Sequence, residues 1–200
     1  MTDFDWLFDP PELETARTVK PRTLTRQVEK RETRLAMKRE RAAEVLTTLP
    51  GRGATTHIVS NGLFDYWDFC PLIIDLLGGK VDSFYGSTWT MNRDNTAELL
   101  ALIDEGKLTN VAILTGLYFK RREAAVYATL LDGLTQRGQR FLASKNHTKI
   151  MLFEKPPDYI TVESSANWTA NPRVEQTAIS NDRILWEFHS GWMEGLFNDD

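Results

Sequence analysis

The chain has 200 residues, of which 42% are hydrophobic and 26% are charged, which is typical of a soluble globular protein with one substantial core. No stretch approaches the roughly 20 apolar residues of a membrane span, and residues 1–5 are acidic without an apolar signal segment, so we expect a cytoplasmic protein without a membrane partner. The net charge of −4 is unevenly distributed, because residues 17–41 hold ten Lys or Arg and three Glu. A basic arm on an acidic body favours phosphate polymers or an acidic protein surface as partners.

A basic amphipathic helix is predicted over residues 23–47, after a loose acidic leader at 1–16. At 100° per residue its apolar residues form a narrow stripe, made of Leu24, Val28, Leu35, Ala42 and Leu46. Basic residues occupy the neighbouring face, namely Arg26, Lys30, Arg31, Arg34, Lys38 and Arg41. Two interpretations stay open and are compatible: the stripe packs the helix on the body, or the basic face, with Arg34, grips nucleic acid or a second subunit.

The segment Pro50-Gly51-Arg52-Gly53 breaks this helix and predicts a division into an N-terminal extension at 1–50 and a main domain at 51–200. Helices and strands alternate along the main domain. The predicted strands cover residues 55–60, 81–85, 110–115, 140–144, 148–154, 159–163 and 176–179. The predicted helices cover residues 66–77, 96–105, 122–136 and 183–196. This alternation indicates an α/β fold with a mixed β-sheet flanked by helices on both faces.

The segment from His147 to Glu175 concentrates the groups needed to attack a phosphodiester. His147 and Lys149 would project from one face of the strand predicted at 148–154, roughly 7 Å apart at the backbone, because strand side chains alternate. Ser165 and Asn167, also two residues apart, repeat this arrangement after the next strand.

This pattern resembles the phospholipase D superfamily motif, in which His-x-Lys-x4-Asp is followed by Gly-Ser-x-Asn. Here the residues read His147-Thr148-Lys149-Ile150-Met151-Leu152-Phe153-Glu154, and later Ser164-Ser165-Ala166-Asn167. Glu175 lies where single-motif nucleases of the family carry a glutamate. The sequence departs from the family at Glu154, in place of Asp, and at Ser164, in place of Gly. The resemblance covers about 140 residues, although the specific match is confined to 147–175.

The resemblance implies a homodimer, because family sites use two His-x-Lys motifs and this chain has one. One His147 would attack phosphorus and form a phosphohistidine, and the other would protonate the leaving alcohol and then activate water. Lys149 and Asn167 would hold the phosphate oxygens, Ser165 would lend a hydroxyl, and Glu175 would orient the His147 ring. Such a site requires no metal and no cofactor.

Further residues are candidates for substrate binding. Trp89, in the segment 86–90 after a predicted strand, either stacks a base or packs in the core, and Trp168 lies beside Asn167. Arg121, within Lys120-Arg121-Arg122, either begins a solvated helix or contacts phosphates.

The sequence therefore predicts a metal-independent phosphodiesterase, a nuclease acting on DNA or RNA. Two alternatives remain: a protein with the same fold that binds nucleic acid without cleaving it, and an interaction protein whose helix at 23–47 docks on an acidic partner.

Overall fold

The computed structural model describes residues 27–169 and 172–199, with side chains from residue 35 onward. The chain divides into two compact units, Met1–Arg34 and Leu35–Asp200. The boundary between them falls inside helix α2 (Gln27–Val45). The junction expected near residue 50 stays a prediction. Ala42 and Leu46 are buried in the core of the second unit, as the predicted apolar stripe requires.

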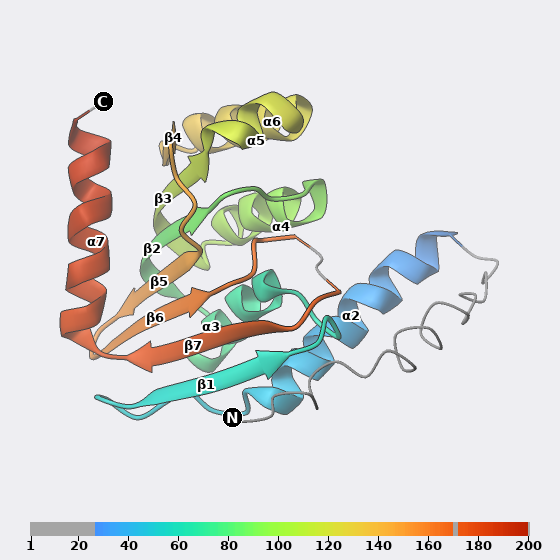
Figure 1. Cartoon of the computed structure of the whole chain (residues 1–200), viewed down its shortest axis with the longest axis vertical. Helices are drawn as coiled ribbons and strands as arrows, with labels where there is room; N and C mark the ends of the chain where they lie inside the picture. The colour runs from blue at the N-terminus through green and yellow to red at the C-terminus, as the bar shows by residue number, and fades with distance from the viewer. Residues whose placement is uncertain (1–26, 170–171, 200) are drawn as a thin grey trace, which may run out of the picture. The chain divides into compact units, whose positions relative to one another are not determined.

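Seven strands form one mixed sheet in the order β1-β7-β6-β5-β2-β3-β4 (Figure 1). Their bounds are β1 Thr55–Ser60, β2 Val81–Thr88, β3 Leu108–Gly116, β4 Arg140–Ser144, β5 Ile150–Lys155, β6 Asp158–Ser164 and β7 Glu175–Asn181. Strands β2, β3 and β4 are parallel to one another, and the remaining neighbours pair antiparallel. The α/β fold with a mixed sheet is confirmed.

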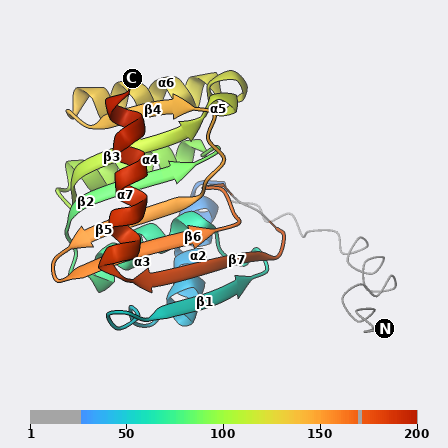
Figure 2. The same cartoon turned by 60° about the vertical axis from the view of Figure 1, so that its left-hand side comes forward.

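Helices cover both faces of the sheet. Besides α2, they are η2 (Tyr66–Asp68, a 3-10 turn), α3 (Phe69–Leu76), α4 (Arg93–Asp104), α5 (Leu117–Arg122), α6 (Ala124–Gln136) and α7 (Arg183–Asn198). Of the helices that the structure describes in the main domain, α7 covers one face, and α3, α4, α5 and α6 lie on the other (Figure 2). None of the helices in the described ranges is long and apolar enough to cross a membrane.

The larger core lies between the sheet and α3, α4 and α6, and the smaller one lies under α7. Strand β3 is buried along its last six residues, which explains why it reads as a continuous apolar run in the sequence. Under α7 the core is formed by Leu114, Ile150, Leu152, Trp186 and Met193. Cys70 is buried in α3 as a free thiol, as its apolar surroundings predict.

Two predicted elements need correction. The helix expected at 122–136 is α6 and begins two residues later, at Ala124, because Arg122 ends the separate short helix α5 and the backbone at Glu123 is not helical. The strand expected from Thr148 begins at Ile150 instead. His147 and Lys149 therefore lie in the loop before β5 rather than on a strand face.

Candidate functional site

The predicted catalytic residues gather at one edge of the sheet. The register of the strands shows that their ends lie side by side along this edge. The paired residues there are Ser87 with Ile150, Ile150 with Glu163, Ser164 with Thr177, Thr88 with Thr115, and Gly116 with Ser144. Parallel strands β2, β3 and β4 all end here, β5 and β7 begin here, and β6 ends here. In open α/β sheets, the crevice beyond the carboxyl ends of the strands is the usual place for a ligand.

A side chain explains why the His147 segment is a loop. The amide oxygen of Asn146 accepts hydrogen bonds from the Thr148 backbone N–H at 3.0 Å and from its hydroxyl at 2.7 Å. Asparagine commonly bonds backbone groups two residues later in this way, which replaces a strand ladder by a turn. The Asn146 amide nitrogen donates to the Ser87 hydroxyl at 3.0 Å, so the loop is tied to the end of β2.

His147 and Lys149 meet in this loop, although not by strand alternation. The Lys149 ammonium lies 2.8 Å from Nδ1 of His147 and donates to the His147 carbonyl at 2.7 Å. His147 is exposed, whereas Lys149 is half-buried. Burial lowers the pKa of Lys149, and the charge of Glu175 acts in the opposite direction. Because the Lys149 ammonium has lost part of its hydration, a bound anion beside it would be stabilised.

Ser165 and Glu175 form the second pair. The Ser165 hydroxyl donates to the Glu175 carboxylate and accepts from the Gln176 N–H at 3.1 Å. The Ser165 N–H in turn donates to the Gln176 carbonyl at 3.1 Å, which fixes the segment after β6 against the start of β7. The expected contact of Glu175 with the His147 ring stays a prediction, because in the structure the Nδ1 atom faces Lys149.

Asn167 is half-buried, and within the described residues its amide oxygen is buried without a hydrogen-bond partner. An unpaired buried amide oxygen is costly and is retained more readily at a functional site than elsewhere. Asn167 thus stays in the candidate site.

The two departures from the family motif lie at different places in the sheet. The Ser164 hydroxyl donates to the Gln176 carbonyl at 2.8 Å, lies 2.9 Å from the Thr177 hydroxyl and accepts from the Ala166 N–H at 3.2 Å. Its side chain therefore stabilises the turn that carries Ser165. Glu154 lies near the opposite end of β5, paired with Tyr159, away from the His147 loop.

The segment at the end of β2 lies against the His147 loop and the Trp168 backbone. The Ser87 hydroxyl lies 2.6 Å from that of Thr148, and the Thr88 hydroxyl accepts from the Trp168 N–H at 3.2 Å. Ser87 and Thr88 are both buried. These hydroxyls and Asn146 hold the His147 loop in place. Asn146 was not predicted from the sequence, although its position directly before His147 could have indicated its role.

The two tryptophans have different roles. Trp89 is half-buried, with its ring 5.4 Å from that of His147, so it remains a candidate for substrate binding. Trp168 is fully buried and packs against Trp67 and Phe84. Its ring also occupies the space that a Cβ at Gly86 would need. The prediction that Trp168 contacts substrate is therefore corrected, because its ring belongs to the core.

The basic candidates are only partly described. Arg121 is exposed on α5, which begins directly after the carboxyl end of β3. Arg34 lies outside the residues whose side chains are described. Farther along α2, Lys38 contacts Asp65 at 2.5 Å and Arg39 pairs with Glu98. These two cations hold the helix to acidic groups of the same unit.

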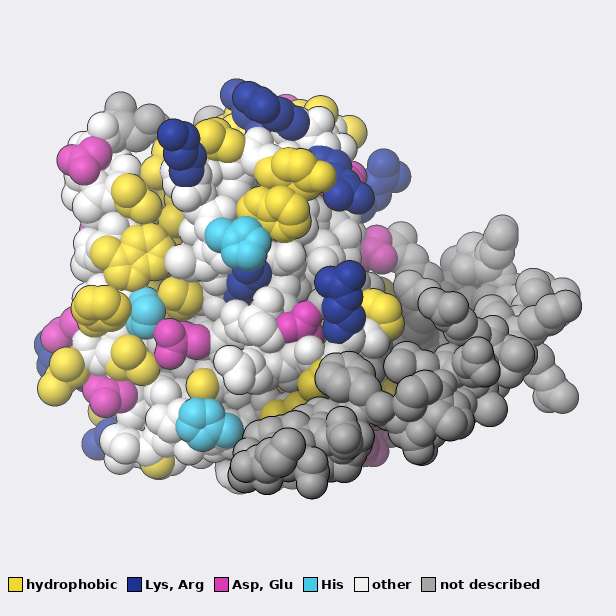
Figure 3. Space-filling model, viewed as in Figure 1, with side chains coloured by type: hydrophobic (Ala, Val, Ile, Leu, Met, Phe, Trp, Pro, Cys, Tyr) yellow, Lys and Arg dark blue, Asp and Glu magenta, His cyan; other side chains and the backbone are white. Residues whose placement is uncertain are grey.

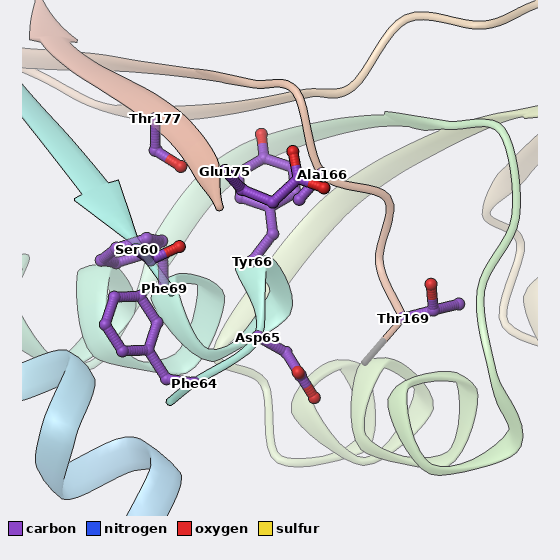
Figure 4. Close-up of a pocket in the computed structure, with 9 residues that line it drawn as sticks. All are labelled: Ser60, Phe64, Asp65, Tyr66, Phe69, Ala166, Thr169, Glu175 and Thr177. Carbon is purple, nitrogen blue, oxygen red and sulfur yellow. The ribbon is translucent and has the colours of Figure 1, made fainter. Parts of the chain in front are cut away.

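A small pocket adjoins Glu175 (Figure 4). Tyr66, one of its lining residues, is buried and donates its hydroxyl to the Val162 carbonyl at 2.8 Å. The same hydroxyl lies 3.4 Å from the Lys149 carbonyl, so Tyr66 supports the backbone of the His147 loop. Burial raises the pKa of Tyr66, which keeps the phenol protonated as a donor. No group of three or more His, Cys, Asp or Glu side chains suited to a metal ion occurs in the described ranges.

Comparison with known proteins gives a structural likeness without a sequence match. No protein-family model and no curated protein matches the sequence. Polyphosphate kinase from Porphyromonas gingivalis is similar over 74% of this chain and 26% of its own length, with a TM-score of 0.53 and 16% identity. NucT from Helicobacter pylori is similar over 71% of this chain and 95% of its own, with a TM-score of 0.51 and 12% identity. This chain thus spans about a quarter of the kinase and nearly all of NucT.

A third similar structure is TrmBL2, described as an archaeal chromatin protein with a novel mode of DNA binding. It is similar over 98% of this chain and 66% of its own length, with a TM-score of 0.51 and 10% identity. At these identities the likenesses establish the fold alone. The kinase and NucT both belong to the phospholipase D-like superfamily.

Proposed function

The chain has the phospholipase D-like fold, and on that premise we propose that it is a metal-independent phosphodiesterase that cleaves DNA or RNA at the interface of a homodimer. One observation carries the proposal. An imidazole and an ammonium in contact at 2.8 Å share a sheet edge with a hydroxyl–carboxylate pair, at the positions of the family motif.

The reaction proceeds in two balanced steps. Nε2 of one His147 attacks phosphorus, and the bond from phosphorus to the leaving oxygen breaks. The leaving oxygen takes a proton from the His147 of the second subunit. That second histidine then removes a proton from water, which attacks the phosphohistidine and breaks the phosphorus–nitrogen bond. Lys149 and Asn167 stabilise the charge on the phosphate oxygens.

The contact of Lys149 with Nδ1 defines the resting state. An ammonium that donates to Nδ1 leaves the proton of a neutral ring on Nε2, so this contact must be released before either histidine acts. The histidine that acts as the acid carries a proton on both ring nitrogens and becomes neutral when it protonates the leaving oxygen. For the nucleophile, Nε2 must be free. A bound phosphate attracts the half-buried Lys149 ammonium away from Nδ1. The ring proton then resides on Nδ1, which donates a hydrogen bond to Glu175.

The test is diesterase activity of the wild type and His147→Ala, with and without EDTA, on a generic diester and on labelled DNA and RNA. We expect activity that survives EDTA and falls about 10³-fold or more in the variant, because a covalent nucleophile is lost. His57→Ala is the matched control, since His57 is also exposed but lies on strand β1. Equal activity in His147→Ala and the wild type would contradict the proposal.

A second candidate is a nucleic-acid-binding protein without turnover. The likeness to TrmBL2, whose description names DNA binding, favours it. In this case the wild type binds oligonucleotides and cleaves none of the substrates, and His147→Ala leaves the affinity unchanged.

A further inference from the structure

An aromatic stack lies beside His147. The ring centroids of Trp89 and Tyr118 are 4.5 Å apart with an interplanar angle of 8°, and the Trp89 ring also lies 5.4 Å from the His147 ring. Tyr118 is 42% exposed, and Leu117 next to it is 43% exposed. Figure 3 shows hydrophobic side chains at the surface directly beside a histidine, with Lys and Arg side chains nearby. An exposed aromatic surface therefore adjoins the group proposed to attack phosphorus.

The stack is held in place by its surroundings. A Cβ at Gly116 would lie 2.5 Å from the Trp89 ring, so the absence of a side chain at Gly116 is what admits the ring. Tyr118 follows directly on the first residue of α5, and its hydroxyl accepts from the Arg122 guanidinium at 2.9 Å. A ring with fixed neighbours loses little conformational freedom when a ligand stacks on it.

The charge around the stack suits a nucleic acid strand. The last turn of α5 carries Lys120, Arg121 and Arg122, and all three side chains are exposed. A flat aromatic surface flanked by cations, next to a phosphate-binding lysine, matches the combination of base stacking and backbone attraction that binds single strands. An ordinary solvated helix end accounts for the charges but not for the exposed stack.

We infer that Tyr118, backed by Trp89, is a stacking platform for an unpaired nucleobase close to the scissile phosphate. In a duplex both faces of each base are covered by its neighbours, so a base reaches the platform only from a single strand, an end or a loop. The inference rests on the proposed function for the nature of the substrate. It adds that this site selects single-stranded over double-stranded nucleic acid.

Binding tests this inference independently of cleavage. Fluorescence anisotropy would give the Kd of a labelled single strand, of the same strand with abasic sugars, and of the matching duplex, all measured on His147→Ala so that nothing is cleaved. We expect Tyr118→Ala in that background to weaken binding of the base-bearing strand about 5- to 150-fold, the range for loss of one base stack. Binding of the abasic strand stays unchanged.

Two control variants sharpen the result. Tyr118→Phe keeps the ring and should restore the affinity, and Phe188→Ala removes an exposed aromatic ring on α7, on the other face of the sheet, and should leave it unchanged. Equal losses for base-bearing and abasic strands, or a change of oligomeric state in Tyr118→Ala, would overturn the inference. Tyr118-dependent binding without cleavage by the wild type would overturn the proposed function and leave the platform standing.

Discussion

At the scale of single residues, the site depends on contacts that the spacing of the motif does not specify. Lys149 lies against Nδ1 of His147, and the Ser165 hydroxyl lies against Glu175. The charge of Glu175 also opposes the effect of burial on the Lys149 pKa, so the two pairs are electrostatically linked. Removing the Glu175 carboxylate would therefore change the environment of the Lys149 ammonium, and removing the ammonium would change that of the carboxylate.

A titratable residue beneath this region gives a prediction for stability. Burial raises the pKa of Asp68 to about 6 from the usual 3.8, although its carboxylate accepts from the Asp65 N–H at 2.6 Å. The folded protein then binds more protons than the unfolded chain between these values, so stability falls as the pH rises from about 4 to about 6. The wild type should lose about 2–3 kcal/mol of unfolding free energy over this range. For Asp68→Asn we expect no such loss, because asparagine does not titrate.

Urea unfolding of both proteins at pH 4 and pH 7.5 measures the effect. The free energy of unfolding of the variant should exceed that of the wild type at pH 7.5 only. At pH 4 the two should be similar, since the asparagine keeps an acceptor for the Asp65 N–H. Parallel pH profiles for the two proteins would show that Asp68 titrates normally.

At the scale of elements, the junction of β3 with α5 determines where the His147 loop lies. A Cβ at Gly116 would lie 2.9 Å from the Trp89 carbonyl and 3.0 Å from the Asn146 carbonyl, and backbone atoms cannot rotate away. We expect Gly116→Ala to lower stability by about 1–3 kcal/mol. We also expect it to lower activity at least about 10-fold, because the loop is displaced.

Gly191→Ala is the matched control for this change. Gly191 lies in α7 with no atom within 4 Å of the added Cβ, so the substitution should stabilise the helix by up to about 1 kcal/mol and leave activity unchanged. Unfolding free energies and initial rates of both variants decide the point. Wild-type activity in Gly116→Ala would show that the loop tolerates displacement.

At the scale of the whole molecule, the proposal requires two chains for each site. We expect a particle of twice 22.9 kDa in sedimentation. Wild type and His147→Ala, unfolded and refolded together in equal amounts, should give about a quarter of the wild-type activity, because only wild-type homodimers hold both histidines. An activity of about half would mean that each chain carries an independent site.

Much of the fold was readable from the sequence, because hydrophobic period and turn residues are local signals. Strands 55–60 and 140–144 have the predicted bounds, and the helix predicted at 66–77 ends before two glycines with positive φ. The bounds failed where a side chain overrode the local pattern. Asn146 takes the Thr148 N–H, so β5 begins two residues later than predicted. The backbone at Glu123 is not helical, so the helix predicted from Arg122 begins at Ala124.

The sequence by itself determined the fold class, and it indicated the candidate reactive groups, since the motif residues His147, Lys149, Ser165, Asn167 and Glu175 lie within 29 residues of one another. Only the tertiary structure decided which neighbours these groups have. It placed Trp168 in the core and brought Tyr118 on α5 against Trp89 after β2, a contact across 29 positions of the chain. The physical reason is that periodicity reports which face of an element is apolar, whereas contacts between strand ends depend on sheet order and register, which long-range packing selects.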